Sequence, residues 1–172
     1  MSKPKKRCPK GGESVGLLAL LCHQIESNNM VFKDVSQARI LLEKKLTESD
    51  MNDGQARLTL QSLAPFLTRD EYHFLKKEVS PNKMNKMGVK VIMRSSEYRM
   101  HLSLWNDNEN NNSGCKFVLE NEWNKLKTDN KLQKGDFIQI LSFRSKKCLN
   151  FAFLGPKRSF KLLGTTIESY PW

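Results

Sequence analysis

The sequence predicts a mainly β protein whose strands form one barrel or sandwich, and three observations support this fold class. Several short segments alternate apolar and polar side chains at the period of a strand, most clearly residues 89–94 and 99–104. Only two short helical patterns interrupt these strands. Strands and helices do not alternate regularly, and no segment repeats at a solenoid or propeller period, which argues against a parallel sheet or a repeat protein.

The length of the chain sets its domain organisation. Its 172 residues allow one domain with a packed core plus tails, and 38% hydrophobic with 27% charged residues is ordinary for a globular protein. We expect a basic tail with a short amphipathic helix (1–38), one folded domain (39–154) and a flexible C-terminal tail (155–172). The helix is predicted over 15–27 by its apolar spacing. The same run imitates a signal peptide, but it is short and lacks a small-residue cleavage site.

In the first half of the domain, alternation around residues 42–46 and 58–60 predicts two strands. Thr68 and Glu71 form a capping-box pattern, which predicts a short helix ending near Lys77. A lysine-rich loop with Pro81 and Gly88 follows.

In the second half, strands are predicted over 115–119, 137–143 and 149–154, with a one- to two-turn helix at Trp123. The last two strands are expected to be joined by a basic hairpin that carries Arg144, Lys146 and Lys147. One core should bury the apolar side chains of Leu46, Leu58, Leu102, Leu104, Val118, Trp123, Ile138 and Phe151.

The charge of the chain is its most unusual property. A net charge of +11 favours a polyanionic partner, either nucleic acid or an anionic membrane surface. The basic residues concentrate in three segments, 1–10, 65–100 and 136–172. A solvated surface that keeps the protein soluble would explain one such segment, and it remains an alternative for all three. No apolar run approaches the length of a membrane span.

The sequence contains no recognisable catalytic or metal-binding motif. There is no glycine-rich phosphate loop, no serine elbow and no cysteine–histidine nucleophile pattern. The 4 cysteines and 3 histidines have no metal-ligand spacing. We therefore expect no enzymatic activity, cofactor, metal or small-molecule substrate.

Two polar loops are the candidate functional elements: residues 47–57, called the first arm below, and residues 105–114, called the second arm. Asparagine and glutamine amides can pair with adenine edges, and arginine can pair with guanine. Two such loops that project from one end of a barrel could enter a DNA groove together. The alternative is that the asparagine run is only a flexible hairpin loop.

An ordered set of motifs resembles the plant B3 DNA-binding domain from about residue 39 to 154, and most nearly its plant-specific group once labelled a domain of unknown function. The opening strand and first arm of that domain are similar to Leu42-x-Lys44-x-Leu46-Thr47-x-Ser49-Asp50-Met51 followed by Arg57-Leu58. The later matches are Met87-Gly88-Val89, Tyr98 to Trp105, Phe117-Val118-Leu119, Trp123, Leu132-x-x-Gly135-Asp136 and Ser142-Phe143-Arg144.

This resemblance implies a seven-stranded open β-barrel (a B3-type pseudobarrel) with two short α-helices, whose arms grip the DNA major groove. It implies that Lys44 holds a phosphate, that Arg57 anchors the first arm, and that the second arm runs from Asn106 to Lys116. Ala56 stands where many members carry a base-reading asparagine. The expected DNA-binding residues are Lys44, Asn52, Gln55, Arg57, Asn106, Asn108, Asn111, Asn112, Ser113 and Lys116.

The function predicted on this basis is sequence-selective double-stranded DNA binding in a nuclear transcription regulator, with other transcription proteins as further candidate partners and no membrane partner. The run containing Lys5, Lys6 and Arg7 resembles a nuclear-import signal, and a merely basic tail is its alternative. Acidic Asp107 and Glu109 in the second arm favour another class, a protein-interaction module that has lost base readout. Barrels of this kind also occur in restriction enzymes, but the chain has no clustered carboxylate–lysine nuclease motif.

Overall fold

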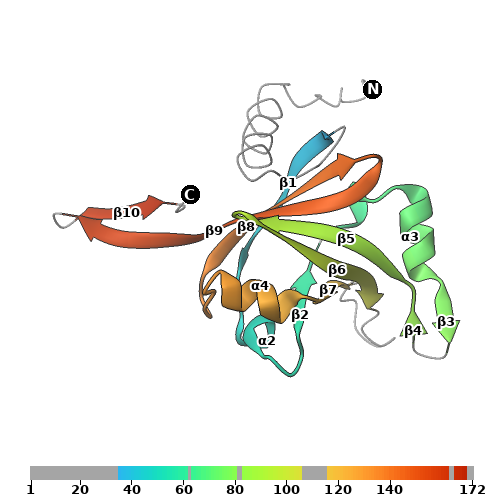
Figure 1. Cartoon of the computed structure of the whole chain (residues 1–172), viewed down its shortest axis with the longest axis horizontal. Coiled ribbons are helices and arrows are strands. Elements are labelled where there is room, and N and C mark those ends of the chain that lie inside the picture. The colour runs from blue at the N-terminus through green and yellow to red at the C-terminus, as the bar shows by residue number, and fades with distance from the viewer. Residues whose placement is uncertain (1–34, 62, 81–82, 106–115, 163–164, 170–172) are drawn as a thin grey trace, which may run out of the picture.

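A computed structural model of the chain describes residues 35–61, 63–80, 83–105, 116–162 and 165–169. Its main feature is a strongly curled sheet whose seven strands follow the order β1-β8-β9-β5-β6-β7-β2, with β10 paired to β9 outside this path (Figure 1). A separate hairpin is formed by β3 and β4. The predicted seven-stranded open barrel is confirmed.

The elements of the described chain have the following bounds. The strands are β1 (Ser36–Lys45), β2 (Arg57–Leu60), β3 (Glu78–Ser80), β4 (Lys83–Met84), β5 (Lys86–Met93), β6 (Ser96–Trp105), β7 (Lys116–Asn121), β8 (Phe137–Ser145), β9 (Cys148–Leu162) and β10 (Thr165–Ser169). The helices are α2 (Glu48–Met51), the 3-10 helix η1 (Ala64–Phe66), α3 (Arg69–Lys76) and α4 (Trp123–Asp129).

The barrel is open because its two terminal strands, β1 and β2, are not neighbours in the strand order. Neighbouring strands in this order are antiparallel except for β5 and β9, which are parallel. The first arm is the segment that connects β1 to β2. It therefore crosses the opening of the barrel, and its conformation has to be stabilised by side chains, since no strand ladder does so.

The inner face of the sheet surrounds the main hydrophobic core. All eight side chains predicted to lie in the core are buried. A second cluster lies on the opposite face of the β1-β8-β9-β5 wall and includes Leu141, Phe143, Ala152 and Leu154. Strands buried on both faces read as continuous apolar runs, which explains why β8 and β9 lack clear alternation.

Both predicted helices are present. The backbone N–H of Thr68 donates to Glu71 Oε2 (2.8 Å) and the backbone N–H of Glu71 donates to Thr68 Oγ1 (3.2 Å), so the capping box that begins α3 is formed as the sequence indicates. In α4, Trp123 and Leu126 face the core and are fully buried. The one-turn helix α2 was not predicted. It lies inside the first arm, which was expected to be a loop.

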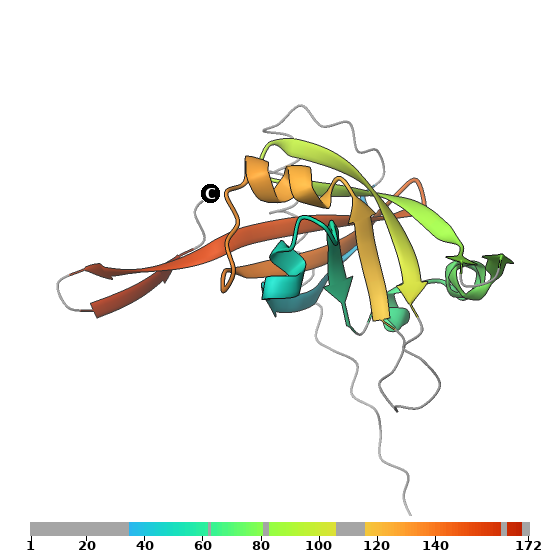
Figure 2. The same cartoon turned by 90° about the horizontal axis from the view of Figure 1, so that it is seen from below.

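Two segments differ from their predictions. Arg144 does not belong to the basic hairpin, because it lies in β8, is only 7% exposed and binds Glu71 of α3. The turn itself consists of Lys146 and Lys147. The C-terminal segment is not simply a tail, because β9 continues past residue 154 to Leu162 and pairs with β10. Figures 1 and 2 show this hairpin extending away from the barrel. The helix predicted over 15–27 lies outside the described residues.

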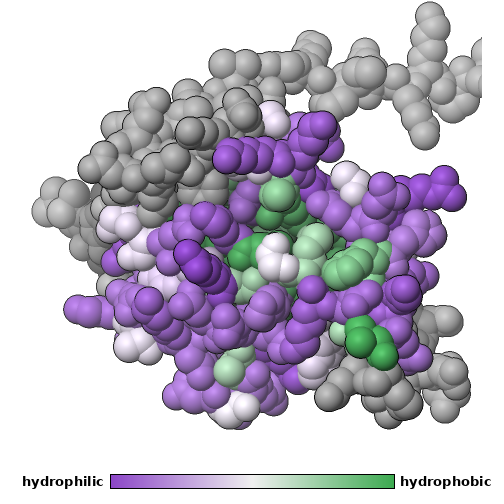
Figure 3. All heavy atoms as spheres, turned by 45° about the vertical axis from the view of Figure 1, so that its right-hand side comes forward, coloured by the Kyte–Doolittle hydropathy of each residue, from purple (hydrophilic) through white to green (hydrophobic). Residues whose placement is uncertain are grey.

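The surface beside α3 and the β3–β4 hairpin is mainly hydrophilic, with apolar areas between hydrophilic side chains (Figure 3). No helix within the described ranges is long and apolar enough to cross a membrane. The same part of the chain holds no group of three or more side chains suited to bind a metal ion.

Candidate nucleic-acid interface

Three of the four strands that flank the two arms lie side by side, since β7 pairs with both β2 and β6. Arg57, the last residue of the first arm, opens β2, and Trp105, the first residue of the second arm, closes β6. Their side chains meet outside the barrel, where the Arg57 guanidinium carbon lies 4.1 Å from the centroid of the Trp105 ring. This cation–π contact joins the two arms directly. The second arm beyond Trp105 lies outside the described residues.

The first arm is organised internally around Asp50. Its carboxylate accepts hydrogen bonds from the Thr47 backbone N–H (2.9 Å) and Thr47 Oγ1 (2.7 Å), which closes the capping box of α2. The second oxygen accepts from the Thr59 backbone N–H at 3.4 Å. Lys44 Nζ lies 3.1 Å from the same carboxylate. Because Asp50 is only 2% exposed, it needs these donors to remain charged inside the protein.

Helix α4 holds the first arm from behind. Trp123 Nε1 donates to the backbone oxygen of Asp50 at 2.6 Å. One turn later, Lys127 Nζ donates to the backbone oxygen of Met51 (3.0 Å) and to Asp53 Oδ1 (2.9 Å). Lys127 is buried, so its ammonium depends on these two acceptors. Residues four apart lie on one helix face, which is why both side chains reach the arm.

The base of the arm is tied to the turn before β8. The backbone N–H of Leu46 donates to the Asp136 carbonyl and the backbone N–H of Gly135 donates to the Leu46 carbonyl, both at 2.8 Å. Gly135 has φ +93°, a backbone conformation that is strained for any residue with a side chain. Glycine is therefore required at this contact. Lys134 Nζ also pairs with Glu48 at 2.6 Å, and its hydrogen bond and charge hold the pKa of that exposed carboxyl below its ordinary value.

The tip of the arm is exposed, although Lys127 and Asn124 of α4 bind Asp53 within it. Asn52 and Gln55 are both exposed, and the Asn52 side chain accepts from the Gln55 backbone N–H at 3.2 Å, which forms a turn. Ala56 has φ +46°, in the left-handed region that asparagine and glycine adopt at lower cost. The tip therefore presents two amides at the surface.

The basic side chains near the arms are not equally available to a ligand. Lys44 is paired with Asp50, Lys86 with Glu120 and Lys134 with Glu48. Arg57 forms no ion pair with any residue that the structure describes, and within these residues its guanidinium contacts the neutral ring of Trp105. No carboxylate within the described ranges compensates its charge, in contrast to those of the three lysines.

The structure brings part of the predicted site together. Lys44, Asn52, Gln55 and Arg57 all lie in the first arm or beside it, and Lys116 faces Trp105 across the β6–β7 ladder. The contribution of each to binding stays a prediction. The other predicted site residues lie outside the described ranges: Asn106, Asn108, Asn111, Asn112 and Ser113 of the second arm, and Lys5, Lys6 and Arg7 of the import run.

The sequence analysis missed the residues that hold the arm. Asp50 was noted only as part of a motif, and Lys127 and the Arg57–Trp105 contact were not singled out. One signal for Lys127 was available, because its spacing of four from Trp123 puts both on one helix face. No local pattern indicates that Trp105 meets Arg57, since the contact depends on the pairing of β7 with both flanking strands.

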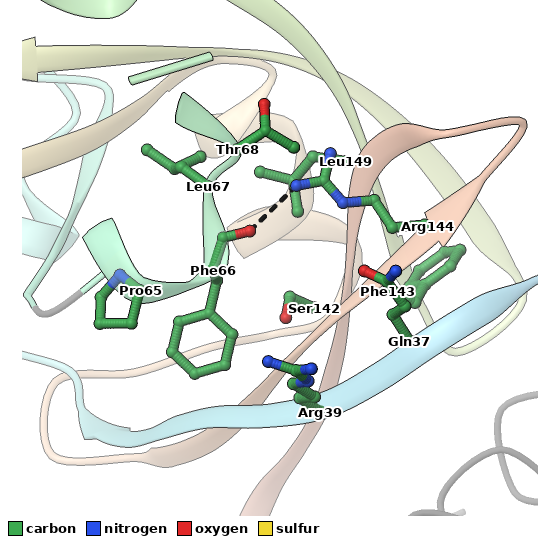
Figure 4. A pocket seen from close by; sticks show the side chains of 10 residues that line it. All are labelled: Gln37, Arg39, Pro65, Phe66, Leu67, Thr68, Ser142, Phe143, Arg144 and Leu149. Atoms are coloured by element: carbon green, nitrogen blue, oxygen red, sulfur yellow. Dashed lines mark hydrogen bonds between the residues drawn. The ribbon is translucent and has the colours of Figure 1, made fainter. Parts of the chain in front are cut away.

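A small pocket on the other side of the barrel belongs to the scaffold (Figure 4). Its Arg144 binds Glu71 through both terminal nitrogens and donates to the Phe66 carbonyl at 2.9 Å. Burial acts to raise the pKa of Glu71, but the hydrogen bonds from Arg144 and Thr68, with the Arg144 charge, outweigh it, and the pKa lies below its ordinary value. Both terminal nitrogens of this arginine are engaged inside the protein.

The open barrel with an arm across its gap defines the chain as a B3-type domain. A family model described as "B3 domain-containing protein At2g31720-like" matches residues 19–157, and the chain belongs to this family. The resemblance found in the sequence is thereby confirmed.

Curated relatives and solved structures were also matched. The chain is similar to two Arabidopsis thaliana proteins, B3 domain-containing protein At1g05920 (31% identity, 70% of this chain, 41% of the relative) and B3 domain-containing protein At2g31720 (32% identity, 68% and 38%). It thus spans about two fifths of their length. Among solved structures, the Arabidopsis FUS3–DNA complex matches with TM-score 0.46, 20% identity and coverage of 67% of this chain and 94% of that chain. The Arabidopsis thaliana transcription factor LEC2–DNA complex matches with TM-score 0.42, 22% identity and coverage of 68% and 92%.

Proposed function

We propose that this chain binds double-stranded DNA sequence-selectively through its two arms, as part of a nuclear transcription regulator. The observation that carries the proposal is the guanidinium of Arg57, which lies over the ring of Trp105 at the junction of the arms and pairs with no carboxylate among the described residues. The net charge of +11 supports a polyanionic partner. Membership of a B3 domain family is consistent with a DNA-binding arm and with a polyanionic partner.

In this proposal the first arm enters the major groove as a pre-shaped element. Arg57 pairs with the O6 and N7 acceptors of a guanine, and the amides of Asn52 and Gln55 pair with neighbouring base edges. The hydrogen bonds from α4 reduce the ordering that binding requires, because the arm already has its shape. Asn106, Asn108, Asn111, Asn112, Ser113 and Lys116 are proposed to provide the second arm's contacts.

Phosphate contacts are proposed to supply most of the affinity. Lys44 is one such contact, and its pairing with Asp50 gives it a second task, to hold the base of the arm. Lys5, Lys6 and Arg7 are proposed to direct nuclear import. Replacing all three with alanine in a large fluorescent fusion should leave the fusion in the cytoplasm, and unchanged nuclear signal would remove this part of the proposal.

The alternative function is a protein-interaction module with weak base readout. One observation favours it: the lysines at positions 44, 86 and 134 are already neutralised by carboxylates, which weakens the attraction for phosphate. Under this alternative, the purified protein would prefer no duplex over random DNA.

Selection from a pool of random duplexes, followed by titration of the selected site at two salt concentrations, tests the proposal. Arg57→Ala should cost about 1–3 kcal/mol on the selected site and flatten its preference. Arg69→Ala is the matched control, because Arg69 is an exposed arginine on α3, outside both arms. Deleting residues 1–12 should reduce the salt dependence but keep the preference. If that deletion abolished binding while Arg57→Ala did nothing, binding would be only charge attraction by the tail.

A further inference from the structure

We infer that Trp105 is a positioning residue that determines specificity, by holding the guanidinium of Arg57 flat so that its N–H edge is presented to a guanine. This inference rests on the proposed DNA-binding function and extends it to a residue outside the predicted set of contacts. It is carried by the geometry of the Arg57–Trp105 contact and by the hydrogen bonds that hold Glu120, the residue opposite Arg57 in the β2–β7 ladder.

The guanidinium of Arg57 lies over the ring of Trp105. A guanidinium 4.1 Å from the centroid of an indole is well within the range of a cation–π contact, and tryptophan is the strongest partner for it. Stacking uses the face of the guanidinium and leaves its N–H groups at the edge. These edge donors are the ones that form the two parallel hydrogen bonds to guanine O6 and N7.

A carboxylate at this position would have the opposite effect. It would take the same edge donors in a bidentate pair and neutralise the charge. Arg144 illustrates that case, because Glu71 and two backbone carbonyls occupy its N–H groups. A neutral ring fixes the direction of Arg57 without occupying the groups that DNA would need.

The carboxylate directly opposite Arg57 in the β2–β7 ladder is already hydrogen-bonded to other side chains. Glu120 pairs with Arg57 across the β2–β7 ladder, so the two side chains emerge on the same face. However, one oxygen of Glu120 accepts from Lys86 Nζ (2.9 Å) and the other accepts from Ser103 Oγ (3.0 Å). Lys86 and Ser103 thus hold Glu120 toward β5 and β6, and among the described residues Arg57 keeps its contact with Trp105.

Trp105 can be substituted without opening the core. Its side chain is 42% exposed, and it belongs to neither hydrophobic cluster. Trp105→Leu removes the ring and keeps an apolar side chain, while Trp105→Phe keeps a weaker ring. Lys86→Met tests the other half of the arrangement, because it releases Glu120 to compete for Arg57.

The experiment measures the affinity of each variant for the selected duplex and for duplexes changed at single base pairs, using fluorescein-labelled DNA. The position that Arg57 reads is the G·C pair at which Arg57→Ala loses its preference. At that pair, Trp105→Leu should lower the preference by roughly two- to thirty-fold, and Trp105→Phe should restore part of it. Lys86→Met should act in the same direction. In the Arg57→Ala background, Trp105→Leu should have no further effect on this pair.

Three outcomes would overturn the inference. If Trp105→Leu weakened all duplexes equally, or added fully to Arg57→Ala, Trp105 would contact DNA by itself. If Arg57→Ala flattened the preference while Trp105→Leu did not, Arg57 would not need the ring, and the proposed function would stand alone. If the intact protein preferred no duplex, the proposed function would fail together with the inference.

Discussion

Arg57 and Arg144 are both held by a defined partner, but the two partners have opposite consequences. Arg144 lies in β8, is 7% exposed and donates to Glu71 and to the carbonyls of Phe66 and Lys147. Arg57 lies at the edge of the barrel and rests on an aromatic ring that accepts none of its N–H groups in a conventional hydrogen bond. The difference indicates which arginine stabilises the fold and which is available to bind an anion.

The largest expected effect is on stability, at Arg144. Arg144→Met leaves a largely buried carboxylate and two carbonyls without their donor, so the free energy of unfolding should fall by about 3–5 kcal/mol in urea titrations followed by circular dichroism. Arg57→Met should change it by no more than about 0.5 kcal/mol. The double variant Glu71→Leu with Arg144→Met should recover much of the loss, because it removes both charges. If both variants lost the same unfolding free energy, Arg144 would not stabilise the fold more than Arg57 does.

The same pair predicts a pH dependence. Although burial alone would raise it, the pKa of Glu71 in the folded protein is depressed, chiefly by Arg144. Its contribution to stability is therefore complete above the pKa of the unfolded chain and is lost as the pH falls through the lower folded pKa. The difference in unfolding free energy between wild type and Arg144→Met should be full at pH 7 and shrink below about pH 4. A constant difference down to pH 2 would contradict the assignment.

The next effect concerns the support of the first arm. Lys127→Met removes the donor to the Met51 carbonyl and to Asp53, and should cost about 1–3 kcal/mol of unfolding free energy. Amides of residues 50–56 should exchange faster with deuterium, while those of β8 should not. Lys125→Met, on the exposed side of α4, is the control. If exchange in the arm stayed unchanged, α4 would not be what orders it.

A smaller effect is expected at Ala56. Both Ala56→Gly and Ala56→Asn relieve a left-handed backbone, and each should raise the unfolding free energy by up to about 1 kcal/mol. Only asparagine also adds an amide beside Arg57, so only Ala56→Asn should increase the preference for the selected duplex over random DNA. An equal gain in preference for both variants would mean that arm stability, and not a base contact, limits recognition.

The smallest effect is expected at the β8–β9 turn. Lys146 and Lys147 have φ +49° and +66°, as a two-residue type I′ turn requires, and lysine is poorly suited to both positions. Lys146→Asn with Lys147→Gly should stabilise the fold by about 0.5–1 kcal/mol. The turn lies at the opposite end of β1 from the first arm, so the sequence preference should not change. A loss of sequence preference in this variant would mean that the DNA interface includes this end of the barrel.

The features that the sequence predicted correctly depend on neighbours along the chain. Alternation identified the strands and core residues, and the Thr68–Glu71 spacing identified the start of α3, because side-chain direction and capping follow from local backbone geometry. The ordered motifs identified the family, and with it an open barrel whose β1 and β2 are connected by the first arm.

Tertiary structure alone decided which charged residues are free. Arg144 was assigned to a basic hairpin, yet its carboxylate partner lies 73 residues away. Lys127 reads as a surface lysine of a short helix, yet it is buried against Asp53, 74 residues away. Arg57 meets Trp105 only because β7 pairs with both of their strands. Composition and spacing reveal that a chain is basic, but the availability of each charge depends on partners that the fold brings from distant positions.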